Sequence, residues 1–413
     1  MAIQLIHVSD IHFGSGETHG RLNPASGLNV RFEDFVAALT KTVDFAIAEK
    51  VDVFLFSGDA YRNASPEPVY QKQFATQLKR LSSAGIQTIL VVGNHDQILR
   101  STSSHSLSVF QSLEVPGVVT VDRPLLKRID TANGALQLIG LPHITRHHLI
   151  TLEKYACLPS AVLDTVLIEH MTNLLRGYYD ELDPTLPTVV TAHMSLDSAL
   201  AGIEQDLLIG YTLTFPLAMF IDSRVDYVAL GHIHRHQVLR EHAPAVAYAG
   251  SLERVDFGEE KEDKGFIHVL LERNNVQHRF HSINPRPFIT VDADLTKVED
   301  PTAKLCQKIE QSVQPGCVLR LRYRCNQEQL REIDQSRLQA AAKEALTFKI
   351  YPEIVCAQSR ARMPELTESS VSSPLGALQT YLDEVAPARK KELLEKAKAI
   401  MDELNCDLHA GNN

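Results

Sequence analysis

Eight side chains that can bind a metal ion or move a proton follow short apolar runs of this sequence. They are Asp10, His12, Asp59, Asn94, His95, His193, His232 and His234. A single D-x-H or G-x-H motif is weak, because Asp and His are also common in turns. Turn chemistry alone rarely gives D-x-H, G-D, G-N-H-D and G-H-x-H in this order, each after an apolar run. The pattern therefore predicts one metal-binding site.

The types and spacing of these residues indicate which ions the site would take. In an extended segment residues i and i+2 face the same way, so Asp10 with His12 and His232 with His234 can each present two donors. Two divalent ions roughly 3.5–4 Å apart need an anionic ligand between them, and Asp59 is the expected bridge. Imidazole with some carboxylate favours Mn, Fe or Zn over Mg, so two Mn²⁺ ions are the first expectation.

The elements that must position these residues are apolar, β-branched runs in residues 1–284, separated by stretches with helical periodicity. The runs cover residues 3–10, 51–59, 87–94, 136–142, 187–193, 225–232 and 245–251. Gly58, Gly93 and Gly231 each precede a candidate ligand, where a small residue permits a sharp turn and close backbone approach. The sequence predicts a layered α/β fold with the site beyond the carboxyl ends of its strands, on one edge of the sheet.

Composition limits the protein class. The chain has 413 residues, 44% hydrophobic and 22% charged, which predicts a globular protein of more than one domain. A net charge of −10 argues against a protein that grips DNA over its whole surface. The N-terminus lacks a basic segment before its apolar stretch, no apolar run approaches roughly 18 residues, and the six cysteines form no C-x-x-C pair. We therefore expect a cytoplasmic protein with no membrane contact, disulfide framework or zinc ribbon.

The order and spacing of the motifs resemble those of the calcineurin-like metallophosphoesterases over about the first 280 residues. The resemblance implies a four-layered α/β/β/α fold with a two-metal site. Asp10, His12, Asp59 and His234 would hold one ion, and Asp59, Asn94, His193 and His232 the other. His95 would be the catalytic histidine of an in-line hydrolysis without a covalent intermediate.

A later segment narrows the resemblance. AGSLERVDFGEEKEDKGF, residues 249–266, is similar to the segment after the last metal motif in SbcD/Mre11-type DNA-repair nuclease subunits. Taken alone, its charged run Glu259–Lys264 predicts the solvated loop of a β-hairpin. The resemblance implies a Mn-dependent 3′-5′ double-strand exonuclease and single-strand or hairpin endonuclease, within an SbcCD-like complex for double-strand break repair and recombination. Its partners would be DNA, an SbcC/Rad50-like coiled-coil ATPase and a second copy, forming a homodimer within a heterotetramer.

The remaining chain predicts three further parts. Residues 285–358 read as a smaller α+β unit in the order strand, helix, strand, helix, strand, with the second helix over 327–346. This unit resembles the capping domain of the same nuclease subunits. Residues 359–374 read as a linker, and residues 375–413 as an amphipathic helical tail. The run CVLRLRYR places Arg320, Arg322 and Arg324 on one strand face, which suits a solvated face balanced by carboxylates slightly better than a DNA-facing patch.

The tail and one earlier helix leave the mode of association open. The tail can pack on its own domain or, as the resemblance implies, on the coiled coil of the ATPase. The helix expected within residues 66–82 can face the core, as its own apolar pattern allows, or contribute to the homodimer, as the resemblance implies.

Two other functions stay open. One is a metallophosphoesterase for a small phosphodiester or phosphomonoester, which would hydrolyse model esters with no effect of duplex DNA or an ATPase. The other is a scaffold without turnover, against which the complete set of candidate ligands argues.

Overall fold

The computed structural model describes residues 2–97, 104–146, 158–200, 213–355, 374–385 and 389–410. The chain divides into two compact units, which are described separately. The first consists of residues 1–292, 303–322 and 335–351, and the second of residues 293–302, 323–334 and 352–413. The predicted linker, 359–374, falls almost wholly outside the described residues.

The first unit contains two six-stranded sheets. In spatial order the strands of one sheet are β14 (Asn275–Ser282), β13 (Gly265–Glu272), β1 (Ile3–Val8), β2 (Val53–Phe56), β3 (Gln87–Val91) and β4 (Val118–Val121). Those of the other are β11 (Gln237–Arg240), β12 (Ala245–Tyr248), β10 (Tyr227–Gly231), β7 (Thr188–His193), β6 (Gly134–Leu141) and β5 (Leu125–Thr131). The seven predicted runs correspond to β1, β2, β3, β6, β7, β10 and β12.

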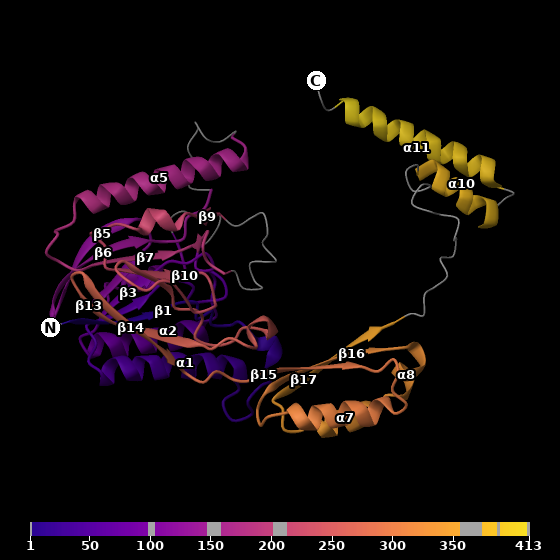
Figure 1. Cartoon of the computed structure of the whole chain (residues 1–413), viewed down its shortest axis with the longest axis horizontal. Helices are drawn as coiled ribbons and strands as arrows, with labels where there is room; N and C mark the ends of the chain where they lie inside the picture. The colour runs from indigo at the N-terminus through magenta and orange to yellow at the C-terminus, as the bar shows by residue number, and fades with distance from the viewer. Residues whose placement is uncertain are drawn as a thin grey trace. The chain divides into compact units, whose positions relative to one another are not determined.

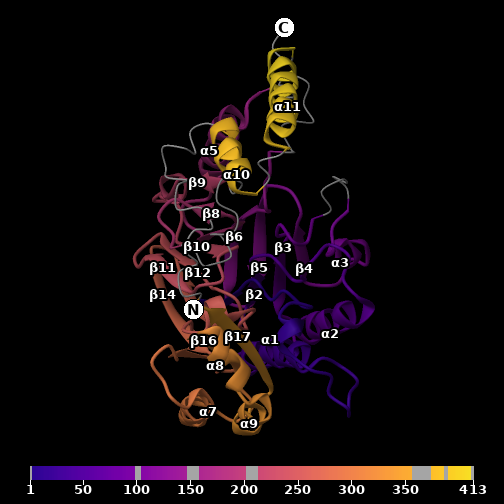
Figure 2. The ribbon, with the colours of Figure 1, turned by 90° about the vertical axis from the view of Figure 1, so that its right-hand side faces the viewer.

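Three apolar clusters make this unit four layers thick (Figure 1). Helices α1 (Val30–Ala48) and α2 (Pro68–Ser83) cover the outer face of the first sheet, beside β2, β3 and β4 in the turned view (Figure 2). Helix α5 (Ser160–Asp180) covers the outer face of the second sheet. A third cluster, including Leu55, Ile89 and Val189, fills the space between the sheets. The predicted α/β/β/α arrangement is confirmed.

The first unit also contains several short elements. They are η1 (Glu17–His19), α3 (Ser108–Ser112), β8 (Ser195–Leu196), β9 (Thr214–Phe215), η3 (Leu217–Phe220) and η4 (Phe257–Glu259). In helix α2 the apolar residues Phe74, Leu78 and Leu81 are buried in the core, as the core-facing alternative predicts. These three side chains therefore cannot supply an exposed dimer face.

The later elements follow the predicted order. They are β15 (Phe288–Asp294), α7 (Pro301–Ser312), β16 (Val318–Cys325), α8 (Gln327–Glu332), α9 (Gln335–Ala341) and β17 (Thr347–Ile354), and the three strands form a sheet in the order β15-β16-β17. The single helix expected over 327–346 is wrong. It breaks because the buried residue Ile333 is extended, with ψ 116°, and the backbone N–H of Asp334 donates to the Thr302 hydroxyl.

The tail contains two helices, α10 (Pro374–Val385) and α11 (Lys390–Ala410), which contact each other. Leu382 is buried, whereas Tyr381 and Ile400 are about half exposed. Among the described helices, none combines the length and the apolar character that crossing a membrane requires.

Candidate metal centre

The eight predicted side chains lie together where the two sheets of the first unit meet. Strands β1, β2 and β3 run parallel in one sheet, and β7 and β10 run parallel in the other. Their carboxyl ends carry, in turn, Asp10 and His12, Asp59, Asn94 and His95, His193, and His232 and His234. The expectation of a single sheet edge is therefore corrected, since each sheet supplies part of the site.

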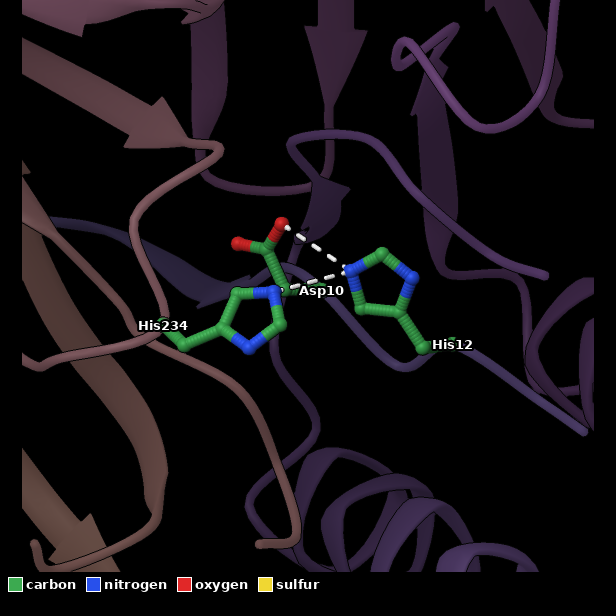
Figure 3. Close-up of side chains that lie close together, drawn as sticks. All are labelled: Asp10, His12 and His234. Atoms are coloured by element: carbon green, nitrogen blue, oxygen red, sulfur yellow. Dashed lines mark hydrogen bonds and ion pairs between the residues drawn. The ribbon is translucent and has the colours of Figure 1, made fainter. Parts of the chain in front are cut away.

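Asp10, His12 and His234 form one buried group with ligand atoms within 4.8 Å of one another. The His12 Nε2 lies 3.0 Å from the His234 Nε2 and 3.8 Å from an Asp10 carboxylate oxygen. Figure 3 shows Asp10 and His234 both turned toward His12. Two imidazole nitrogens at this distance need a shared proton or a cation beside them, so the group suits a metal ion.

The second group contains Asp59, Asn94, His193 and His232. The Asn94 Oδ1 lies 3.0 Å from both the His193 Nε2 and the His232 Nδ1. One Asp59 oxygen lies 3.2 Å from the His193 Nε2 and 3.5 Å from the His12 Nε2. Asp59 thus lies between the two groups, where the sequence predicted a bridging carboxylate.

His95 stands at the exposed side of this cluster. Its backbone N–H donates to Asp59 at 2.9 Å, and its ring Nδ1 lies 2.8 Å from the Arg62 carbonyl oxygen. The ring meets that of His12 edge to face, with 4.9 Å between centroids. The side chain is accessible to solvent. Of the eight clustered side chains, His95 is the one that is exposed.

The backbone at the site is unusual. Asp10, His12, Asp59 and His232 have positive φ angles of 52°, 50°, 62° and 95°. Left-handed backbone is uncommon for residues other than glycine and often marks functional sites. The expectation that Asp10 and His12 lie in an extended segment is therefore wrong. Both side chains do face the cluster, but a left-handed backbone directs them there.

The predicted need for small residues before the ligands is confirmed. A Cβ on Gly58, whose φ is +103°, would lie 2.2 Å from the His193 Nδ1. A Cβ on Gly93 would lie 2.1 Å from an Asp59 carboxylate oxygen. Either methyl group would displace a candidate ligand.

The electrostatics of the cluster leave neutral imidazoles beside the carboxylate of Asp59. Burial lowers the pKa values of His12 and His232 well below their usual range, which leaves the neutral imidazoles that metals bind. Burial also acts to lower the pKa of His193, but the carboxylate of Asp59 raises it to about 9. Negative potential therefore dominates around His193. The buried His232 Nε2 has no hydrogen-bond partner among the described residues, so it can donate its lone pair to an ion.

Asp96 supports the cluster in a way that the sequence did not predict. One carboxylate oxygen accepts hydrogen bonds from the backbone N–H groups of Asp59, Ala60 and Gly93, at 3.0, 3.3 and 3.1 Å. The other accepts from the Ser106 hydroxyl at 2.8 Å. Burial and the nearby Asp59 charge raise the pKa of Asp96 to about 6. Asp96 thus ties the β2 and β3 turns together.

His143, which follows β6, also lies at the site but is not one of the eight predicted side chains. Its ring Nδ1 lies 3.2 Å from the His193 carbonyl oxygen, and its ring lies 5.7 Å from that of His232 between centroids. The available signal was its position after a buried strand, as for the other candidates. His147 and His148, which follow in the same segment, lie outside the described residues.

The predicted solvated loop at Glu259–Lys264 is only partly correct. Glu259 and Lys264 are buried, with 5% and 1% of their surface exposed, whereas Lys261 and Asp263 are exposed. A carboxylate oxygen of Glu259 lies 2.7 Å from the His234 Nδ1. Part of the charged run therefore packs behind a candidate ligand.

A small pocket of about 180 Å³ adjoins the cluster on the side of the β1 and β2 turns. Its lining includes Phe13, Tyr61 and Arg62, which closely follow His12 and Asp59 in the chain.

Comparison with known proteins bears on the chemistry. The chain is 26% identical to the SbcD component of the SbcCD nuclease of Escherichia coli, across 95% of this chain and 96% of that protein. It is 25% identical to the DNA double-strand break repair protein Mre11 of Haloferax volcanii, across 71% of this chain and 55% of that one. A solved dimetal phosphatase from Danio rerio gives a TM-score of 0.41 at 10% identity, covering 68% of this chain and 96% of that chain. The chain is thus homologous to the SbcD and Mre11 nucleases.

The pattern of the calcineurin-like phosphoesterase family matches residues 3–236, more than half of the chain. The matched segment contains the parallel strands that carry the site and all eight clustered side chains. The clustered Asp and His groups, in this fold, suggest a two-metal site. This chain therefore belongs to the calcineurin-like phosphoesterases and is an enzyme that hydrolyses phosphoester bonds.

Proposed function

We propose that this chain is the nuclease component of an SbcCD-like DNA-repair complex and cuts DNA with the help of two Mn²⁺ ions. It would act as a 3′-5′ exonuclease on double strands and as an endonuclease on single strands and hairpins. The observation that carries the proposal is a buried two-group Asp/His cluster in a chain that aligns over 95% of its length with a component of a nuclease.

The proposed ligand sets follow the two groups. Asp10, His12, Asp59 and His234 would hold one ion, and Asp59, Asn94, His193 and His232 the other. Two divalent ions supply an activated nucleophile and neutralise the charge that develops on the phosphoryl oxygens. A cluster rich in imidazole, with carboxylates and without thiolates, suits Mn²⁺ better than Mg²⁺.

His95 is the proposed catalytic residue. The Arg62 carbonyl oxygen at 2.8 Å fixes the ring as an Nδ1–H donor, so Nε2 is the nitrogen left to interact with the phosphoester. From the exposed rim, this imidazole can stabilise a phosphoryl oxygen or transfer a proton to the leaving oxygen. The arrangement needs no covalent intermediate.

The proposed ATPase partner would bind the tail. Helices α10 and α11 leave apolar side chains such as Tyr381 and Ile400 about half exposed, as expected of a helix pair that docks on another helical surface. A DNA-binding partner would also offset the net charge of −10, which disfavours unaided DNA binding. We propose residues 1–284 as the nuclease domain, 285–358 as the capping domain, 359–374 as the linker and 375–413 as the partner-binding segment, within a heterotetramer that contains two copies of this chain.

The test is cleavage of labelled duplex and hairpin DNA by the purified chain in Mn²⁺, with and without the coexpressed ATPase. His95→Ala should abolish cleavage and retain the fold. His242→Ala is the matched control, because His242 is an exposed histidine in the turn between β11 and β12. It should leave cleavage unchanged.

The outcomes separate the alternatives. Cleavage that requires Mn²⁺ and His95 supports the nuclease, and stimulation by the ATPase supports the complex. Hydrolysis of small phosphodiesters without DNA cleavage in either setting would instead indicate a small-molecule phosphoesterase. Absence of both activities in protein that binds Mn²⁺ would indicate a scaffold.

A further inference from the structure

The charged run after β12 contributes two buried side chains that lie behind His234. Glu259, in η4, and Lys264, directly before β13, form an ion pair of 2.9 Å. Both side chains are almost wholly shielded from solvent, with 7% and 0% of their area exposed. Buried charges are costly unless they are paired, so this pair needs a reason to be there.

The Glu259 carboxylate contacts the ring of His234. One carboxylate oxygen lies 2.7 Å from the His234 Nδ1. The other accepts from the Val255 backbone N–H at 2.9 Å and forms an ion pair of 2.9 Å with the Lys264 ammonium. An ionised carboxylate only accepts hydrogen bonds, so the His234 Nδ1 must carry a proton. The lone pair of His234 is then on Nε2, the nitrogen that faces His12 and Asp10.

Lys264 contacts the main chain of the same histidine. Its ammonium group donates to the His234 carbonyl oxygen at 2.9 Å, and the Ser251 backbone N–H donates to that oxygen at the same distance. The ammonium group also compensates the Glu259 carboxylate. Residues 251–264 therefore fix both the ring and the main chain of His234.

The run is itself anchored to the rest of the first unit. The Arg254 guanidinium donates to the carbonyl oxygens of Glu259, Glu262 and Arg286, at 3.1, 2.7 and 2.9 Å. These bonds hold the η4 turn that carries Glu259. The Glu259 carboxylate consequently reaches His234 from a fixed backbone.

We infer that Glu259 is a positioning residue that fixes the ring orientation and tautomer of His234, with Lys264 as its charge partner. The inference rests on the proposed role of His234 as a metal ligand. A carboxylate on the far nitrogen of a metal-binding histidine orients the ring and makes it a better donor, and its loss typically costs about 10–100-fold in metal affinity. Glu259 and Lys264 are not candidate ligands themselves.

The test is Mn²⁺ binding, measured by calorimetry and by the electron paramagnetic resonance of free Mn²⁺, in wild-type protein and three full-length variants. Glu259→Ala removes the acceptor, whereas Glu259→Gln keeps an oxygen that can accept from Nδ1. Glu262→Gln is the matched control, because Glu262 contacts the same Lys264 ammonium at 2.8 Å from the same run. Melting temperatures are recorded without divalent ions.

Glu259→Ala should weaken one of the two Mn²⁺-binding steps by about 10–100-fold and leave the other near wild type. Glu259→Gln should lose less Mn²⁺ affinity at that step, and Glu262→Gln should bind Mn²⁺ as the wild type does. Cleavage by the Glu259 variants should recover at high Mn²⁺ concentration with little change in kcat. These results would support the inference.

Wild-type affinity at both steps in folded Glu259→Gln and Glu259→Ala would overturn it. If Glu259→Ala does not fold, the same affinity in Glu259→Gln together with an unshifted Mn²⁺ dependence of cleavage would overturn it. Equal weakening of both steps, in proportion to a fall in melting temperature, would also contradict a specific role. Wild-type protein that binds two Mn²⁺ ions without cleaving DNA would refute the proposed nuclease while leaving the Glu259 result interpretable.

Discussion

Two segments of this chain that carry several charges place them in different environments. In the run Glu259–Lys264, two of the six charged side chains are buried and paired behind a candidate metal ligand. In strand β16, Arg322 and Arg324 are exposed, and each faces carboxylates on neighbouring strands. The local sequence predicted the environment of the second segment correctly and that of the first only in part.

The difference shows where local pattern is sufficient. In a strand, backbone geometry alternates the side chains, so the buried Leu321 and Tyr323 place the arginines on the other face. In the loop no such rule applies, and the contacts with His234, Val255 and Arg254 decide which charges are buried. A charge that is buried by contacts with distant residues should also cost far more to remove than an exposed one.

The largest effect is expected for Lys264→Met, which leaves the buried Glu259 carboxylate without its positive partner. Breaking one side of a buried ion pair costs about 3–5 kcal/mol. We expect the free energy of unfolding to fall by that amount in urea titrations with EDTA present, so that bound metal does not mask the loss.

The double variant Lys264→Met with Glu259→Gln tests the cause. Removal of both charges should restore part of the lost stability, because no uncompensated carboxylate then remains. If the stability losses of the two single variants simply add in the double variant, Lys264 and Glu259 are not coupled. Burial of this pair would then not explain a larger effect than that of the exposed arginines.

The second prediction concerns His7, a buried ionisable group that forms no ion pair within the described part of the chain. Its ring Nδ1 lies 3.0 Å from the Tyr227 hydroxyl, between the two sheets. Burial lowers the pKa of His7 from 6.5 to about 3. The unfolded chain therefore binds a proton more readily than the folded chain below pH 6.5, and stability falls as the pH drops from 6.5 toward 3.

This linkage should remove about 2 kcal/mol of stability between pH 7 and pH 5. His7→Gln removes the titrating group. Between pH 7 and pH 5 the variant should therefore lose about 2 kcal/mol less stability than the wild type, whatever its stability at pH 7. Urea titrations at both pH values measure the difference. Equal acid losses in the two proteins would show that His7 does not contribute.

The third prediction concerns Arg320, the arginine of β16 that is only partly exposed. Its guanidinium lies 4.2 Å from the centroid of the Phe257 ring and donates to the Thr290 hydroxyl at 2.9 Å. Loss of the cation–π contact and the hydrogen bond in Arg320→Ala should lower the free energy of unfolding by about 1–2 kcal/mol. Arg320→Lys should recover part of this loss, because an ammonium also binds an aromatic face; no recovery would assign the effect to the planar guanidinium alone.

Much of the fold was predictable because its inner strands are buried on both faces. Such strands appear as continuous apolar runs, and all seven runs correspond to strands. No local signal indicates the pairing of β1 with β13, which joins Ile3 to Leu271 across most of the first unit. Pairing between residues so far apart in the sequence depends on the fold of the whole unit, so the order of strands in the sheet could not be predicted from the sequence.

The clustering of the site was predictable for a related reason. Strand ends meet at sheet edges, so Asp10, Asp59, Asn94, His193 and His232 could be expected together from their positions alone. The left-handed backbone of Asp10 and His12 was not predictable, since neither residue type requires it. The supporting roles of Asp96 and Glu259 were also missed, because hydrogen bonds to distant backbone and ring atoms leave no periodic pattern.

The smallest effect is expected for Arg322→Ala. Arg322 makes two hydrogen bonds of 2.8 Å with Asp292, but about half of each side chain is exposed. An exposed pair contributes about 0.2–1 kcal/mol, and salt screens it. The small loss of stability should therefore shrink further in high salt. If Arg322→Ala instead lowers the salt dependence of DNA binding by about one counterion, the arginine contacts a phosphate. In that case the exposed face of β16 binds DNA, and Arg322 pairs with Asp292 only when no DNA is bound.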